Sequence, residues 1–184
     1  KRSKFKENFF TDKPLQLYAA TKKSNELVAH AYSSLYGLKC VGLRFFTVYG
    51  PWGRPDMSLF KFVKSILNNK YIEIFNKGNH FRDFTYIDDC ISGILKTIKF
   101  KSEKNFEIFN IASEKPIKLI NFIKIIEKIL MIKSKKKYMG LQKGDTIRTS
   151  ASIKKISRLT GYKPRVSIQM GVRNFINWYK DYHR

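Results

Sequence analysis

Hydrophobic positions along the chain change period between helix-like and strand-like segments. Over residues 17–36 the apolar residues recur at helical spacing, and Gly37 follows as a helix-ending residue. Residues 40–48 are then almost all apolar, β-branched or aromatic. Such a run is typical of a parallel strand that is buried on both faces. The start of the chain therefore predicts a helix followed by a buried strand.

The same alternation continues to the C-terminus. The patterns predict further helices over 57–69, 88–99, 117–131, 152–160 and 168–182, and further strands over 71–75, at the start of 81–89, and over 106–112. Strands that alternate with helices favour an α/β fold with a mostly parallel sheet. The segment 141–150 is predicted to be a loop.

Composition supports a globular protein but leaves the meaning of its charge open. The 184 residues are 43% hydrophobic, which is enough for a real core in one domain or in part of a larger one. A net charge of +23 would ordinarily suggest a polyanionic partner. Only residues 133–137, KSKKK, form a dense basic run, which we interpret as a solvated surface stretch, and the other lysines are spread over every segment. We therefore expect neither a nucleic-acid partner nor a membrane partner.

Cysteine and histidine usage points to a reduced compartment without a metal centre. Cys40 and Cys90 have apolar neighbours and no paired spacing, so we expect a cytoplasmic protein without disulfides. The three histidines are scattered along the chain, and we predict no metal site.

Tyr18 and Lys22 form a Y-x-x-x-K motif on the first predicted helix. At positions i and i+4 both side chains project from one helix face, so the ammonium can lie beside the phenol. A nearby positive charge lowers a tyrosine pKa that is otherwise about 10, and such a phenol can exchange a proton with a sugar hydroxyl. Taken alone, the motif more often marks a half-buried tyrosine beside a solvated lysine. Its context has to decide.

The segments after the motif supply that context. Residues 44–57 read RFFTVYGPWGRPDM, residues 81–89 read FRDFTYIDD, and residues 109–112 read FNIA. Together with the motif, and in this order, they resemble the extended short-chain dehydrogenase/reductase family, specifically its nucleotide-sugar epimerases. The stretch 44–57 most resembles the UDP-glucuronate 4-epimerases. The resemblance runs from about Asp12 to the C-terminus.

The resemblance implies a Rossmann-type fold, NAD as cofactor and a UDP-sugar as substrate. Tyr18 would be the general acid/base at the sugar 4-hydroxyl, and Lys22 would lower its pKa and hold the nicotinamide ribose. Hydride would pass from C4 of the sugar to NAD, the 4-keto sugar would turn over, and hydride would return to its other face. UDP-glucuronate would thereby become UDP-galacturonate.

Four further residues take substrate roles through the same resemblance. Thr47 would face the sugar, Arg54 would bind either the uronate carboxylate or the diphosphate, Arg82 would grip the diphosphate, and Asp145 would contact the ribose or base. Each has an ordinary alternative: a threonine at a strand end, arginines paired with an aspartate nearby in sequence, and an aspartate in a turn. Two weaker candidates lie in the same loop as Asp145: Gln142 and Arg148.

The Gly-rich dinucleotide turn of the family has no counterpart in these residues, and Ser3 does not match the family's Ser/Thr partner of the tyrosine. We therefore expect the C-terminal part of an epimerase. Residues 1–56 would complete the NAD-binding Rossmann domain, and 57–184 would mainly form a small α/β nucleotide-sugar-binding subdomain, with some segments returning to the sheet. Alone, this part is expected to be poorly stable and inactive. A truncated sequence, a split or frame-shifted gene and an incomplete assembly all stay open, and the complete enzyme is expected to be a homodimer.

Three alternative functions stay open beside the UDP-glucuronate 4-epimerase. One is a related epimerase or dehydratase that acts on another nucleotide-sugar. A second is an inactive remnant of such an enzyme. A third, from a different class, is a basic nucleic-acid-binding protein, for which binding would weaken steeply with salt.

Overall fold

The strand predicted over 40–48 divides at Phe46 into two strands with different partners. The structure is a computed structural model that describes residues 4–142 and 144–183. Strand β1 (Cys40–Phe45) pairs in parallel with β6 (Phe106–Ile111), and β2 (Thr47–Tyr49) pairs in parallel with β5 (Phe84–Tyr86). The prediction of one continuous strand was wrong, because each half finds its partner in a different part of the chain. This change of partner sets Thr47 at the start of a strand rather than at the end of one.

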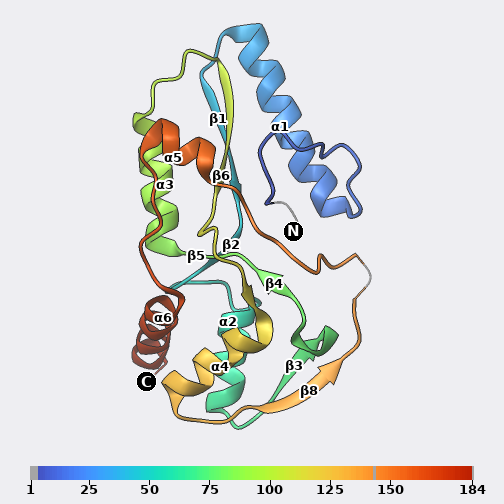
Figure 1. The fold of residues 1–184 in the computed structure, drawn as a ribbon, viewed down its shortest axis with the longest axis vertical. Coiled ribbons are helices and arrows are strands. Elements are labelled where there is room, and N and C mark those ends of the chain that lie inside the picture. The colour runs from blue at the N-terminus through green and yellow to red at the C-terminus, as the bar shows by residue number, and fades with distance from the viewer. Residues whose placement is uncertain (1–3, 143, 184) are drawn as a thin grey trace.

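Helices cover the β1–β6 pair on both sides (Figure 1). Helix α1 (Leu17–Tyr36) lies along one side, and α3 (Ile87–Lys99) and α5 (Lys154–Thr160) lie on the other. On the side of α3 and α5, a buried hydrophobic cluster packs these helices against the strands. It includes Cys90, Phe109, Ile111, Ile156 and Tyr162. Gly37 adopts the left-handed conformation (φ 65°) that the predicted end of α1 requires.

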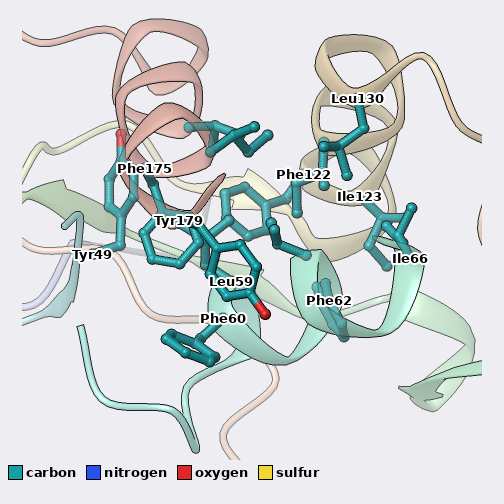
Figure 2. Packing of buried hydrophobic residues seen from close by; sticks show 14 of the residues in the cluster. Tyr49, Leu59, Phe60, Phe62, Ile66, Phe122, Ile123, Leu130, Phe175 and Tyr179 are labelled. Carbon is teal, nitrogen blue, oxygen red and sulfur yellow. The ribbon is translucent and has the colours of Figure 1, made fainter. Parts of the chain in front are cut away.

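A second and larger core lies between three helices. These are α2 (Ser58–Leu67), α4 (Leu119–Leu130) and α6 (Ile168–Tyr182), whose apolar side chains converge in Figure 2. Phe122 is fully buried and stacks on Phe84 of β5, with ring centroids 4.2 Å apart. Burial of such rings is the main force that holds the three helices together.

Four short strands and one helical turn complete this half. Strand β3 (Tyr71–Phe75) leads into the 3-10 turn η1 (Asn76–Gly78) and pairs in parallel with β8 (Lys135–Met139), while β4 (Phe81–Arg82) pairs antiparallel with β7 (Ile117–Lys118). The α/β prediction is confirmed. Among the described residues, however, the strands form two-stranded pairs rather than one continuous sheet.

Strand β8 adds a buried contact to our interpretation of the basic run 133–137, in which Lys133, Lys135 and Lys137 are exposed as expected. The run enters a strand, and Lys136 donates a hydrogen bond to Glu127, whose side chain is 6% exposed. The composition suggested a solvated stretch because it is rich in lysine, but β3 offers a partner strand and Glu127 offers a buried acceptor. Lysine stems can lie along a strand while their ammonium groups reach acceptors at its edge.

Helix α1 and β1 differ from the prediction in their burial. Val41 and Phe45 of β1 are 39% and 48% exposed, and Ser33 is the buried residue of α1. The strand is therefore covered only partly by the elements that the structure describes, and α1 carries an apolar face that contacts solvent. Its exposed apolar residues are Leu17, Leu27, Val28, Tyr32, Leu35 and Tyr36. Within the described ranges, none of the helices has the length and apolar character needed to cross a membrane.

Candidate active site

Tyr18 and Lys22 lie on the same face of α1, as the i, i+4 spacing predicts. The Lys22 ammonium is 5.3 Å from the centroid of the Tyr18 ring, and the ring is 69% exposed. Both side chains line a hollow of about 520 Å³ beside α1, whose walls include the rings of Phe9, Phe10 and Phe45. The phenol is thus accessible, and a cation is held beside it.

A second hollow, of about 720 Å³, begins on the other side of Tyr18. Tyr18, Thr47 and Arg54 all line it. These residues are close to one another only because β2 turns away from β1 at Phe46 and brings the loop after β2 back toward α1. Tyr18 is therefore shared between the hollow that Lys22 lines and the hollow that Thr47 lines.

The backbone of Asp83, whose carboxylate is buried, holds Thr47 in place. The Thr47 amide donates to the backbone oxygen of Asp83 at 3.1 Å, and the Asp83 side chain is fully buried. That side chain accepts hydrogen bonds from the amide and hydroxyl of Ser113 and from the amide of Ala151. Three segments far apart in sequence meet at this carboxylate, which makes the floor of the hollow rigid.

The loop between β2 and α2 carries Arg54. Gly50 has φ 146°, and a Cβ there would lie 2.6 Å from Cγ2 of Ile87, so the loop needs glycine to pass this close to α3. Arg54 is exposed and makes two parallel hydrogen bonds to Asp56, at 3.0 and 2.7 Å. These hydrogen bonds lower the pKa of the Asp56 carboxyl. The Arg54 guanidinium is therefore paired with a nearby aspartate, as the alternative from the sequence expected. Its remaining N–H donors can bind a ligand in the hollow that Arg54 lines.

Arg82 and Asp145 meet at a third hollow, of about 730 Å³, which Thr47 also lines. Arg82 Nη2 donates to Asp145 Oδ1 at 2.7 Å, and Nη1 donates to the backbone oxygen of Thr146 at 2.6 Å. The arginine is not paired with its sequence neighbour Asp83, which is committed to Ser113 and Ala151. The structure thus joins two predicted residues that are 63 positions apart.

The two weaker candidates take other places. Gln142 is exposed and its backbone oxygen accepts a hydrogen bond from the Asp145 amide, at 3.3 Å. The Arg148 guanidinium lies over the ring of Phe81, 4.7 Å from its centroid. Neither residue lines the three hollows described above.

The sequence patterns missed several residues that line the third hollow. Tyr71 and Glu73 alternate outward along β3, and Lys137 comes from β8, which pairs with β3. His80 lines the same hollow from the segment between η1 and β4. The period-2 pattern of residues 71–75 was a signal for the outward side chains of β3, but nothing local marked His80 or Lys137.

The three hollows form a connected row, because Tyr18 belongs to the first and second and Thr47 to the second and third. An accessible phenol with an ammonium beside it lies at one junction, and two arginines lie further along. This arrangement suits proton exchange with a neutral hydroxyl and binding of an anionic group. Residues 4–142 and 144–183 contain no group of three or more histidine, cysteine or acidic side chains that could hold a metal ion.

Comparisons with known proteins match the chain to one family. The model of the NAD dependent epimerase/dehydratase family matches residues 2–112. An uncharacterized protein of Methanocaldococcus jannaschii is 54% identical over 175 residues, covering 95% of this chain and 53% of that protein. UDP-glucuronate 4-epimerase 2 of Arabidopsis thaliana is 42% identical over 195 residues, covering 98% of this chain and 45% of that enzyme. The chain spans about half the length of these curated relatives.

A solved structure extends the similarity to three dimensions. The UDP-glucuronic acid 4-epimerase of Bacillus cereus, in complex with UDP-glucuronic acid and NAD, superposes with a TM-score of 0.91 at 35% identity. The superposition covers 99% of this chain and 58% of that one. The shared fold therefore extends over nearly all of this chain.

Proposed function

Because the chain belongs to the NAD-dependent epimerase/dehydratase family, we propose that it supplies the acid/base and substrate-binding side of a UDP-glucuronate 4-epimerase. The observation that supports this most directly is the row of connected hollows with Tyr18 at the first junction. The first hollow offers the Lys22 ammonium and aromatic walls, and the second offers the accessible phenol of Tyr18. The third hollow offers the paired charges of Arg82 and Asp145. These features match, in order, a nicotinamide ribose, a sugar and a nucleotide diphosphate.

The hollow beside Lys22 fits the nicotinamide end of NAD. Its lining combines the ammonium of Lys22 with the rings of Phe9, Phe10 and Phe45, which suits a ribose hydroxyl and a flat ring. NAD bound there would supply hydride-transfer chemistry for C4 of the sugar. Lys22 would hold the ribose with its ammonium, which lies 5.3 Å from the centroid of the Tyr18 ring. The Gly-rich turn that binds the pyrophosphate in this family is not found in the 184 residues.

Tyr18 then has one task, which is to take the proton from the sugar 4-hydroxyl and return it. Its exposed phenol lies where the first and second hollows meet, so it can reach a sugar in the second. Thr47 would hydrogen-bond that sugar from the start of β2, and Arg54 would contribute the charge for a uronate carboxylate or the diphosphate. At the far end Arg82 would hold the diphosphate and Asp145 the ribose or base. The reaction has no net oxidation, because the hydride and the proton both return to the sugar.

The remaining expectations follow from the same proposal. Residues 1–56 would belong to the NAD-binding side and 57–184 mainly to the nucleotide-sugar side, with β6 and α5 returning beside β1. The complete enzyme would act in the cytoplasm as a homodimer, with the exposed apolar face of α1 contributing to contacts outside the 184 residues.

A chimaera would test the activity. The chain would be joined to the N-terminal region of the Methanocaldococcus relative, given NAD and UDP-glucuronate, and followed by chromatography of the UDP-sugars. We expect UDP-galacturonate to form, and Tyr18→Phe to slow its formation by about 10²- to 10⁴-fold, which is the usual contribution of a general acid/base. Tyr32→Phe, at another exposed tyrosine of α1, is the matched control. A chimaera that binds UDP-glucuronate and NAD but converts nothing would reject the proposal.

A further inference from the structure

His80 is a buried histidine with an unsatisfied ring nitrogen beside the third hollow. The residue is 3% exposed, and its Nε2 is closed to solvent and has no hydrogen-bond partner. The His80 backbone oxygen accepts a hydrogen bond from the Leu119 amide, at 2.8 Å, at the start of α4. The backbone of His80 is therefore anchored to a core helix, and an unsatisfied polar atom at such a buried position is costly and calls for an explanation.

The nearest acidic group to that nitrogen is Asp145. His80 Nε2 lies 3.2 Å from Asp145 Oδ2, out of line for a hydrogen bond, while Asp145 Oδ1 accepts from Arg82 at 2.7 Å. The two oxygens of one carboxylate thus face two different donors. A small rotation of the carboxylate completes the second hydrogen bond without moving the anchored ring.

Burial decides how His80 can act. Its Nε2 is closed to solvent, so it cannot contact a ligand in the hollow directly. The Asp145 side chain is 30% exposed and lines the hollow, as does Arg82. The polar effect of Nε2 on a ligand therefore passes through Asp145, although His80 also belongs to the lining of the hollow.

We infer that His80 is a positioning residue, which sets the orientation of Asp145 and, through it, of Arg82 for a uridine diphosphate. The inference rests on the proposed function, because it assigns the third hollow to the nucleotide. With His80 on one oxygen and Arg82 on the other, the carboxylate has one preferred orientation. Without His80 the carboxylate is held only by Arg82, and the Arg82 guanidinium depends more on its hydrogen bond to the Thr146 oxygen. Preorganisation of this kind lowers the cost of ordering the site when the ligand binds.

Two substitutions separate this role from simple packing. His80→Gln keeps an N–H donor at nearly the reach of Nε2, whereas His80→Leu keeps the bulk and removes the donor. UDP binding to the chimaera would be measured by calorimetry without NAD, and thermal unfolding would be recorded in parallel. We expect His80→Leu to weaken UDP binding about three- to tenfold, as the loss of one ordinary hydrogen bond would, because His80 acts on the ligand only indirectly, and His80→Gln to stay within about twofold of wild type. With UDP-glucuronate as substrate, KM should rise by a larger factor than kcat falls.

A double variant makes the path through Asp145 testable. In an Asp145→Asn background, the additional change His80→Leu should not weaken UDP binding further, because the charged acceptor is already lost. The inference is overturned if both His80 variants bind UDP equally, or if the two losses simply add. If the wild-type chimaera binds UDP and His80→Leu binds it equally well, only this inference is rejected. If the wild-type chimaera does not bind UDP, the proposed function is rejected as well.

Discussion

Replacing Lys136 with methionine should destabilise the fold much more than its place in a lysine-rich run suggests. Lys136 lies in β8 and donates to Oε1 of Glu127, a side chain of α4 that is 6% exposed. The same oxygen accepts from the amide and the hydroxyl of Ser134, at 2.9 and 2.6 Å. The lysine thus provides the only formal charge among the three donors to a buried carboxylate, and methionine preserves most of its length.

The size of the stability loss depends on the Glu127 carboxylate, which stays buried after Lys136 is replaced. Removing one partner of a buried ion pair ordinarily costs about 3–5 kcal/mol, because the other charge stays buried without compensation. Here the two hydrogen bonds from Ser134 remain, and the Lys136 side chain is itself 23% exposed, so we expect a smaller loss, about 2 kcal/mol. With a urea m-value of about 2 kcal/mol/M, the unfolding midpoint should fall by about 1 M.

Acid should remove this difference between the two proteins. Burial raises the pKa of Glu127, but the hydrogen bonds from Lys136 and Ser134 outweigh it, so the pKa in the folded state is lower than the ordinary value of this carboxyl. A lowered pKa in the folded state stabilises the fold above the unfolded-state pKa, and the contribution disappears as the pH falls through the folded-state value. The stability gap between wild type and Lys136→Met should therefore be full at pH 7 and shrink below about pH 4.5.

Urea unfolding followed by tryptophan fluorescence is a suitable assay, because Trp178 packs against the same core as α4. Lys135→Met is the matched control, since Lys135 precedes Lys136 in β8 and is exposed. The reasoning is refuted if both variants lose the same stability at pH 7, or if the gap for Lys136→Met stays constant from pH 7 to pH 3.

Two further substitutions test how the site is supported. Gly171→Ala should cost about 1–3 kcal/mol of stability by overpacking, since a Cβ at Gly171 would lie 2.2 Å from the Tyr49 hydroxyl. Thermal unfolding would measure it against Gly140→Ala, where the added Cβ meets nothing within 4 Å, and equal losses would contradict the packing argument. Arg44→Ala should loosen α1 from β1, because Arg44 makes two hydrogen bonds to Glu26, at 2.7 and 2.9 Å, and lowers the pKa of that carboxyl. Amide exchange across α1 should become faster at pH 7, with a difference from wild type that shrinks in acid as the Glu26 carboxylate is protonated, and unchanged exchange would show that the pair does not hold the helix.

Local periodicity determined the features of the site that lie within one element. The i, i+4 spacing of Tyr18 and Lys22 was enough to place both side chains on one face of α1, and the structure has the ammonium beside the ring. Apolar spacing likewise predicted the helices of the larger core to within a few residues, because a helix is built from contacts between near neighbours in sequence. Gly37 was recognisable as the end of α1 for the same reason.

Contacts between distant residues decided the rest. The break at Phe46 depends on β6 and β5, which lie far along the chain, and the pairing of 135–139 with β3 depends on strands more than 60 residues apart. The sequence likewise did not predict that Arg82 pairs with Asp145 or that His80 lies beside the same carboxylate. The sequence of a segment determines its propensity for helix or strand. Its partner strands, buried hydrogen-bond acceptors and shared hollows form only when distant segments pack together.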